Sequence, residues 1–141
     1  MTRAIVLAGS LNNGALKECS SASTEAFIKI GKKYMVEYVV EALEEAEEVG
    51  QIVISGPKKE LLDLFKEKRR LCIVEGGPTI IKSLLNALEN LDVKDESRIL
   101  IVTSDIPLIT GSIIDDFLKR CSGEEGDVIY PIISKSLNQI K

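Results

Sequence analysis

The sequence predicts an α/β domain with a doubly wound, mostly parallel sheet, and two observations carry this prediction. Short apolar runs alternate with segments of helical periodicity along all 141 residues. The chain is 45% hydrophobic and 28% charged, which is typical of one globular domain. Strands that alternate with helices form a parallel sheet with right-handed crossovers. We therefore expect a single domain over residues 1–141, with strand order 3-2-1-4-5 and helices on both faces.

The first predicted strand, RAIVLA, covers residues 3–8 and ends before Gly9. The other apolar runs that predict strands lie at 52–54, 71–74, 99–103 and 128–133. Between them lie stripes of apolar residues at helical spacing: Val36, Val39, Val40 and Leu43; Leu61, Leu62 and Phe65; Ile80, Ile81, Leu84, Leu85 and Leu88; and Ile113, Ile114, Phe117 and Leu118. In such a Rossmann-like order the first and fourth strands are neighbours, and ligands bind beyond their carboxyl ends. The loops at 9–32 and 104–111 are therefore expected to meet.

Composition excludes several classes of function. The chain has no histidine, so it holds no Ser-His-Asp triad, no Cys-His pair and no H-E-x-x-H zinc site. The net charge of -4 and the pI near 5.0 argue against nucleic acid as the partner. Its longest apolar runs are far shorter than the roughly 18 residues of a membrane span, and the N-terminus lacks a signal-peptide layout. We expect a cytoplasmic protein with no membrane partner.

The loop after the first strand, LAGSLNNGALKE, contains two glycines at a spacing that is also found in phosphate-binding loops. Gly9 and Gly14 have the spacing of a phosphate-binding P-loop, but Ala15 and Leu16 replace its lysine and its serine or threonine. What remains is a turn whose amide groups can face phosphates, with Lys17 as a source of positive charge. An ordinary connection between strand and helix is the alternative.

The loop after the fourth strand carries an acidic residue. Asp105 follows the apolar run at 99–103 and precedes Ile106 and Pro107. A carboxylate at this edge of the sheet is well placed to hold Mg²⁺, which takes oxygen ligands and often bridges to substrate phosphates. The alternative is that Asp105 only caps a turn before the next helix.

Four segments together resemble the MobA-like nucleotidyltransferases. They are AIVLAGS, KKYMVEYVVEAL, EGGPTIIKSLLNAL and ILIVTSDIPLIT, and they occur in the family's order over nearly the whole chain. The family includes molybdenum-cofactor guanylyltransferase, the cytidylyltransferases of isoprenoid synthesis and sugar-nucleotide pyrophosphorylases. The resemblance implies attack by an acceptor oxygen on the α-phosphorus of a nucleoside triphosphate, with pyrophosphate as the leaving group.

The resemblance also implies where the triphosphate binds. The family's loop L-A-G-G-x-G-x-R is matched by Leu7, Ala8, Gly9 and, in place of the second glycine, Ser10. Its arginine is missing, and a gapless register puts Glu25 on the family's later lysine. This departure leaves Lys17 or Lys29 to reach the phosphates, or else the transfer chemistry is weakened or absent.

The remaining site residues follow from the later segments. Gly76, Gly77 and Thr79 resemble the family segment that touches the nucleotide base, and Asp105 matches the magnesium-binding aspartate of the D-x-P pattern. The family's second metal-binding aspartate and its acceptor pocket follow the DVIYPII segment. We therefore expect residues 1–141 to lack the acceptor-binding half.

The sequence thus predicts a magnesium-dependent nucleotidyltransferase that moves an NMP group from an NTP to a phosphorylated or hydroxyl small molecule. A homodimer is compatible with it. The alternative is a non-catalytic nucleotide-binding or assembly module. A glycosyltransferase of related fold ranks last, because the sequence contains no D-x-D motif.

Overall fold

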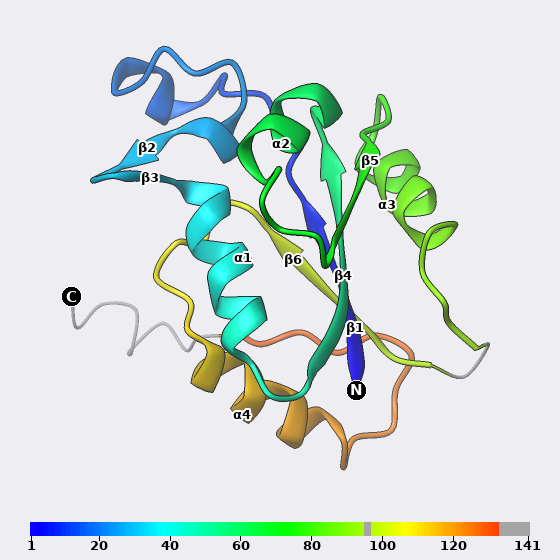
Figure 1. The fold of residues 1–141 in the computed structure, drawn as a ribbon. Coiled ribbons are helices and arrows are strands. Elements are labelled where there is room, and N and C mark those ends of the chain that lie inside the picture. The colour runs from blue at the N-terminus through cyan, green and yellow to red at the C-terminus, as the bar shows by residue number, and fades with distance from the viewer. Residues whose placement is uncertain (95–96, 133–141) are drawn as a thin grey trace, which may run out of the picture.

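The computed structural model describes residues 1–94 and 97–132, and its centre is a parallel sheet of four strands (Figure 1). The order is β5-β4-β1-β6. The strands are β1 (Thr2–Leu7), β4 (Val49–Gly56), β5 (Leu71–Glu75) and β6 (Ile99–Thr103). This confirms the predicted neighbourhood of the first and fourth strands, and the order 3-2-1-4 within the predicted 3-2-1-4-5.

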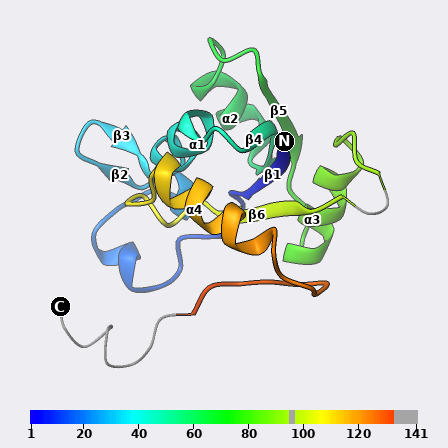
Figure 2. The ribbon, with the colours of Figure 1, turned by 90° about the horizontal axis from the view of Figure 1, so that it is seen from below.

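Helices cover both faces of the sheet. They are α1 (Met35–Glu45), α2 (Lys58–Leu64), α3 (Ile80–Leu88) and α4 (Gly111–Cys121). Alternate residues of β1 feed two cores: Ala4 and Val6 pack with α1, α2 and α4, whereas Ile5 packs with α3. In both views α3 lies apart from the other three helices (Figure 1 and Figure 2). This two-sided burial explains why β1 is apolar at consecutive positions.

The long connection between β1 and α1 contains more structure than the sequence predicts. It holds two 3₁₀ helices, η1 (Ala15–Glu18) and η2 (Glu25–Phe27), and a short antiparallel pair, β2 (Lys29–Ile30) and β3 (Lys33–Tyr34). Gly31 turns this hairpin with a φ of 64°, a conformation that glycine adopts without steric cost. Elements this short carry no hydrophobic period, so the pattern alone does not predict them.

Two predictions of local structure were wrong in part. Residues 128–132 form no strand, and residue 133 lies outside the described residues. Pro131 removes one backbone donor from this segment, and the side chains of Val128 and Tyr130 are 81% and 73% exposed. In α3, Ile80 and Ile81 of the predicted buried stripe are exposed, while Ser83 and Ala87, which lie outside that stripe, are buried. The helix is therefore rotated relative to the stripe.

None of the helices in the described part of the chain has the length and apolar character that a membrane span requires.

Candidate functional site

A cavity of about 260 Å³ opens at the carboxyl edge of the sheet, between the loop after β1 and the start of α3. Its lining combines two segments far apart in sequence: Leu7, Gly9, Ser10, Leu11 and Asn13 with Gly77, Pro78, Thr79, Ile80 and Ser83. Five predicted site residues therefore share one cavity, namely Leu7, Gly9, Ser10, Gly77 and Thr79. In an open parallel sheet this edge is where ligands bind.

Ala8 and Gly76 do not line the cavity but hold its walls in place. Ala8 is fully buried, and its N–H donates to the carbonyl of Ser55 at 2.8 Å. The N–H of Gly76 donates to the carbonyl of Gly56 at 2.9 Å. A Cβ at Gly76 would lie 3.3 Å from the Cα of Gly56, so only glycine at this position lets the two backbones approach without a shift.

Two side-chain hydrogen bonds shape the start of α3. The Oγ1 of Thr79 accepts from the N–H of Lys82 at 3.1 Å, as an N-cap residue does. The Oγ of Ser83 accepts from the N–H of Gly77 at 2.9 Å and lies in the cavity wall. A side chain at Gly77 would collide with the stem of Lys82. The Gly-Gly-Pro turn is therefore held against the helix and not left open.

The same helix end offers donors to a ligand. Within the described residues, the N–H groups of Ile80 and Ile81 donate to no other group, as expected for the first turn of a helix. Ile80 lines the cavity although its side chain is 71% exposed. Unpaired N–H groups together with the positive end of the helix dipole favour a negatively charged or polar ligand atom at this wall.

Asp105 lies at the same edge of the sheet, one strand further along. The last register pair of β1 and β6 is Leu7 with Thr103, and the N–H of Ser104 donates to the carbonyl of Leu7 at 3.2 Å. The Asp105 carboxylate is exposed and accepts a hydrogen bond from the Thr103 Oγ1 at 2.6 Å through Oδ1. It does not line the 260 Å³ cavity. A carboxyl buried away from solvent could not hold a hydrated metal ion. The Asp105 carboxyl is exposed, so a metal role remains open to it.

The donor set around Asp105 limits the kind of metal that it suits. Among residues 1–94 and 97–132, no group of three or more His, Cys, Asp or Glu side chains gathers to hold an ion. A single exposed carboxylate fits Mg²⁺, which commonly takes one or two carboxylates and completes its shell with waters and substrate phosphates. It does not fit a closed structural zinc site.

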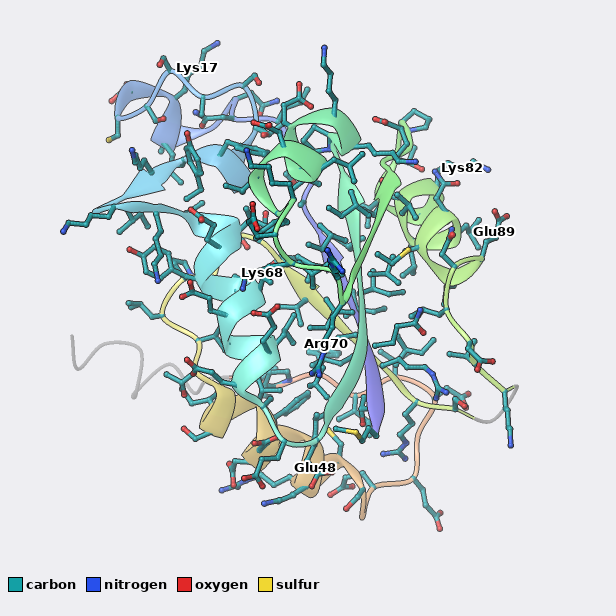
Figure 3. The ribbon with its side chains drawn as sticks, in the orientation of Figure 1. Lys17, Glu48, Lys68, Arg70, Lys82 and Glu89 are labelled. Carbon is teal, nitrogen blue, oxygen red and sulfur yellow. The ribbon has the colours of Figure 1, made fainter. Side chains whose placement is uncertain are left out.

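The predicted lysines lie outside the cavity. Lys17 projects from η1 into solvent (Figure 3), and the Lys29 Nζ lies 5.8 Å from the centre of the Tyr34 ring. Lys33 is held by Glu41, whose two carboxylate oxygens each accept from its Nζ at 2.8 Å; this hydrogen bond raises the pKa of Lys33. In the part of the chain that the structure describes, neither lysine nor arginine lines the cavity. The phosphate-binding roles of Lys17 and Lys29 stay predictions.

Several lining residues were missed by the sequence analysis. Leu11 and Asn13 lie between the matched positions of the first loop, and Pro78 lies between Gly77 and Thr79. Their place next to the matched residues is the signal that was available. Ser83 carried no such signal, because it belongs to the face of α3 that the apolar stripe assigned to solvent.

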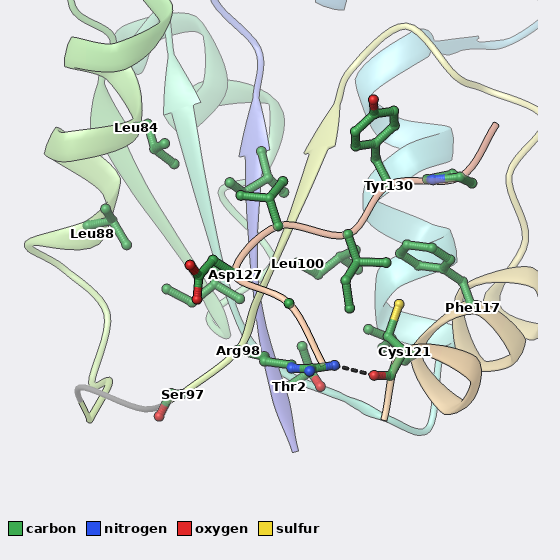
Figure 4. Close-up of a pocket in the computed structure, with 17 residues that line it drawn as sticks. Thr2, Leu84, Leu88, Ser97, Arg98, Leu100, Phe117, Cys121, Asp127 and Tyr130 are labelled. Atoms are coloured by element: carbon green, nitrogen blue, oxygen red, sulfur yellow. Dashed lines mark hydrogen bonds between the residues drawn. The ribbon is translucent and has the colours of Figure 1, made fainter. Parts of the chain in front are cut away.

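A larger cavity of about 500 Å³ lies elsewhere, between α3, β6 and α4, with residues 126–131 over it. Figure 4 shows Leu84 and Leu88 on one side and Phe117 on the other. The guanidinium of Arg98 donates to the carbonyl of Cys121 beside it. The cavity reaches Thr2 and Ile99, at the amino ends of β1 and β6, which is the opposite edge from the ligand site of such sheets. The smaller cavity is therefore the better candidate.

The fold and the smaller cavity define a doubly wound α/β domain with a ligand cavity at the carboxyl ends of its strands. The sequence pattern of the MobA-like NTP transferase domain matches residues 4–140, so the chain belongs to that family. This confirms the resemblance on which the site prediction rests.

Relatives of this chain are transferases. It is 28% identical over 144 residues to the 2-C-methyl-D-erythritol 4-phosphate cytidylyltransferase of Clostridium perfringens, covering 97% of this chain and 60% of that protein. A hypothetical transferase from Thermus thermophilus is 28% identical, with a TM-score of 0.65, over 84% of this chain and 46% of the other. The 4-diphosphocytidyl-2C-methyl-D-erythritol synthase of Anaerococcus prevotii has a TM-score of 0.67 at 14% identity, over 96% and 60%. The chain thus spans about 60% of the length of the curated relative.

Proposed function

We propose that this chain binds a nucleoside triphosphate in the 260 Å³ cavity and transfers its NMP group to a small-molecule acceptor. One observation carries the proposal: the loop after β1 and the start of α3, which the family resemblance assigns to the nucleotide, form a single cavity. Membership of a nucleotidyltransferase family supports the reaction class. The metal, the acceptor and the individual roles of the residues belong to the proposal.

The chemistry asked of these residues is positioning and neutralisation of charge. An acceptor oxygen would attack the α-phosphorus, and the bond between that phosphorus and the oxygen bridging to the β-phosphate would break, releasing pyrophosphate. The backbone amides of Gly9, Ser10 and Leu11 would face the phosphates, with Lys17 or Lys29 brought closer to the leaving group. The turn at Gly76–Thr79 would face the base. Such transfers need little covalent help from side chains, which suits a chain without histidine.

Asp105 is the residue proposed to hold Mg²⁺. When bound, the ion would neutralise charge on the phosphate oxygens. The exposed carboxylate and its bond to Thr103 orient one oxygen ligand beside the end of β1. Because residues 1–94 and 97–132 offer one carboxylate there, the nucleotide itself would supply further oxygen ligands. Metal and nucleotide should therefore bind together and strengthen one another.

A specific observation favours a second candidate function, a nucleotide-binding module without transferase activity. Among the described residues, the cavity is lined by no cationic side chain. The family's later lysine is replaced by Glu25, whose N–H donates to the carbonyl of Ser10 at 3.0 Å. A negatively charged residue whose backbone is bonded to the triphosphate loop opposes the charge neutralisation that the transfer requires.

Binding experiments separate these candidates. We would titrate CTP, GTP, ATP and UTP with and without Mg²⁺ into the wild type, Asp105→Ala and Asp116→Ala. Asp116 is the matched control, because it is an exposed carboxylate that pairs with Arg120 on the surface of α4. A nucleotide Kd that Mg²⁺ lowers, and that Asp105→Ala alone raises by about tenfold or more, would support the metal site. Equal affinity in both variants would contradict it.

Activity decides between transfer and binding alone. The first pair to test is CTP with 2-C-methyl-D-erythritol 4-phosphate, because the name of the Clostridium perfringens relative states that activity. Release of pyrophosphate that depends on both substrates would support a transferase. Nucleotide binding with no pyrophosphate release from a panel of phosphorylated and hydroxyl acceptors would favour the module. If none of the four nucleotides bound, the proposed function would be wrong.

A further inference from the structure

A loop of ten residues, 13–22, leaves the rim of the cavity, and its two ends are joined by a short neck. The Glu25 N–H donates to the Ser10 carbonyl at 3.0 Å, and Leu11 forms a β-bridge with Thr24. The N–H of Asn12 donates to the carbonyl of Ser23 at 3.0 Å. Two residues of this neck, Ser10 and Leu11, also line the cavity.

The side chain of Asn12 closes this loop from the inside. It is 5% exposed, and its Nδ2 donates to the carbonyls of Ser20 at 3.2 Å and Ala22 at 2.9 Å. Because both partners are carbonyl oxygens, only the amide nitrogen can face them, which fixes the orientation of the amide. The Ala22 N–H in turn donates to the Ser20 Oγ at 3.2 Å. Residues 20–22 of the loop are therefore held both by Asn12 and by a hydrogen bond of their own.

The oxygen of the Asn12 amide makes no such hydrogen bond within the described residues. Its Oδ1 is buried and accepts no hydrogen bond from any described residue. Burying an acceptor without a partner is unfavourable. The burial is compensated by the two bonds that the amide nitrogen donates across the loop. A side chain with acceptors alone would face two carbonyls and repel both.

Asn12 also lies between two residues of the cavity wall. Leu11 and Asn13 both line the cavity, and their backbone is continuous with the clamped residue. The family loop L-A-G-G-x-G-x-R has a glycine at this position, and glycine has no side chain to donate. The two hydrogen bonds from the Asn12 Nδ2 to the carbonyls of Ser20 and Ala22, called the Asn12 clamp, are therefore a feature of this chain's own residues. Lys17 belongs to the same loop, in η1.

We infer that Asn12 is a positioning residue: its amide locks the loop at residues 13–22 and thereby pre-forms the nucleotide cavity through Leu11 and Asn13. This inference rests on the proposed nucleotide binding. Pre-organisation lowers the entropy lost when a ligand orders its site, so removing the lock weakens binding without removing any group that touches the ligand.

The test uses Asn12→Ala, Asn12→Asp and two controls. Asn12→Asp keeps the shape but loses both N–H donors, so it should behave like Asn12→Ala. Asn90→Ala removes an exposed amide hydrogen bond, from Asn90 Nδ2 to the carbonyl of Asn86, outside the site. Ile114→Val lowers stability through the core without touching the loop. It controls for an effect of stability alone.

The first readout needs no nucleotide. Trypsin cleavage after Lys17 and hydrogen exchange of the amides at residues 14–22 should both speed up by about tenfold or more in the Asn12 variants, with exchange in α1 unchanged. The controls should match the wild type. Wild-type rates in both Asn12 variants would overturn the clamp.

The second readout is the nucleotide Kd. It should rise by about tenfold in both Asn12 variants and stay unchanged in Asn90→Ala and Ile114→Val. Faster cleavage and exchange of the loop with an unchanged nucleotide Kd would overturn the positioning role of Asn12. The same result would still support its role in locking the loop. If the wild type bound no nucleotide, the proposed function and the positioning role would both fall, and the cleavage rates would still decide whether Asn12 locks the loop.

Discussion

Replacing Gly56 by alanine tests how tightly the strand ends are packed beneath the candidate site. Gly56 is the last residue of β4 and is buried. A Cβ there would lie 2.9 Å from both the carbonyl carbon and the carbonyl oxygen of Ala8, and 3.1 Å from the Cβ of Ala8. Carbon atoms pack best at about 3.5–4.0 Å, so the two backbones must separate by about half an ångström or more.

The size of the effect follows from what resists this separation. The backbones of β1 and β4 are joined by the bond from the Ala8 N–H to the Ser55 carbonyl at 2.8 Å, and Gly56 itself accepts from Gly76 at 2.9 Å. Overpacking of this kind costs about 1–3 kcal/mol. We expect Gly56→Ala to lower the free energy of unfolding by about 2–3 kcal/mol, because backbone and not a flexible side chain has to move.

Urea unfolding at pH 7 measures this change, with Gly14→Ala as the control. A Cβ at Gly14 meets nothing within 4 Å, and its φ of -98° suits any residue. Gly14→Ala should leave stability unchanged or raise it by about 0.4–1 kcal/mol, because alanine restricts the unfolded chain. The nucleotide Kd of Gly56→Ala should also rise, since the shift of Ala8 is passed to Gly9 in the cavity wall. An unfolding free energy of Gly56→Ala within about 0.5 kcal/mol of the wild type would refute the reasoning.

Two further predictions concern side chains that bond to backbone. Ser83→Ala leaves the N–H of Gly77 without its acceptor, so the free energy of unfolding measured in urea should fall by about 1–3 kcal/mol. The nucleotide Kd should also rise. An unchanged Kd would show that Ser83 does not shape the site. Asp115 accepts from the N–H groups of Glu48 and Glu47, and these bonds hold the pKa of its carboxyl below the ordinary 3.8. Its contribution is present above pH 3.8 and is lost as the pH falls below that value, so the urea midpoint of the wild type should drop more steeply between pH 5 and pH 2.5 than that of Asp115→Asn. Parallel pH profiles of the two proteins would contradict this assignment.

The strands of the sheet were predictable because each is an apolar run long enough to identify. The run at 99–103 coincides with β6, and the one at 71–74 lies within β5. Parallel strands bring their carboxyl ends to one edge, so the strand order alone placed Asp105 beside the end of β1. The candidate site was predicted less fully, because the loops at 9–32 and 104–111 were expected to meet, whereas the cavity lies between the loop after β1 and the start of α3.

The orientation of α3 was not predictable from its period. A helical stripe shows which residues can share a face, but it does not show what lies opposite. Here the turn at Gly77 approaches the helix so closely that Ser83 is drawn inward to bond its N–H, and Ile80 is left at the rim of the cavity. The side chains that line the cavity therefore depend on a contact between two elements.

The sequence by itself determined the class of fold, the order of the strands and the edge at which a ligand binds, because hydrophobic periodicity and the rule for parallel crossovers act on local pattern and on connectivity. Only the tertiary structure decided which residues form the cavity, where the lysines lie and how Asn12 closes its loop. These depend on hydrogen bonds and close approaches between residues that are not adjacent in sequence, such as Asn12 with Ser20 and Ala22, in segments without a repeating pattern. The sequence pattern of these segments therefore does not predict that such residues come into contact.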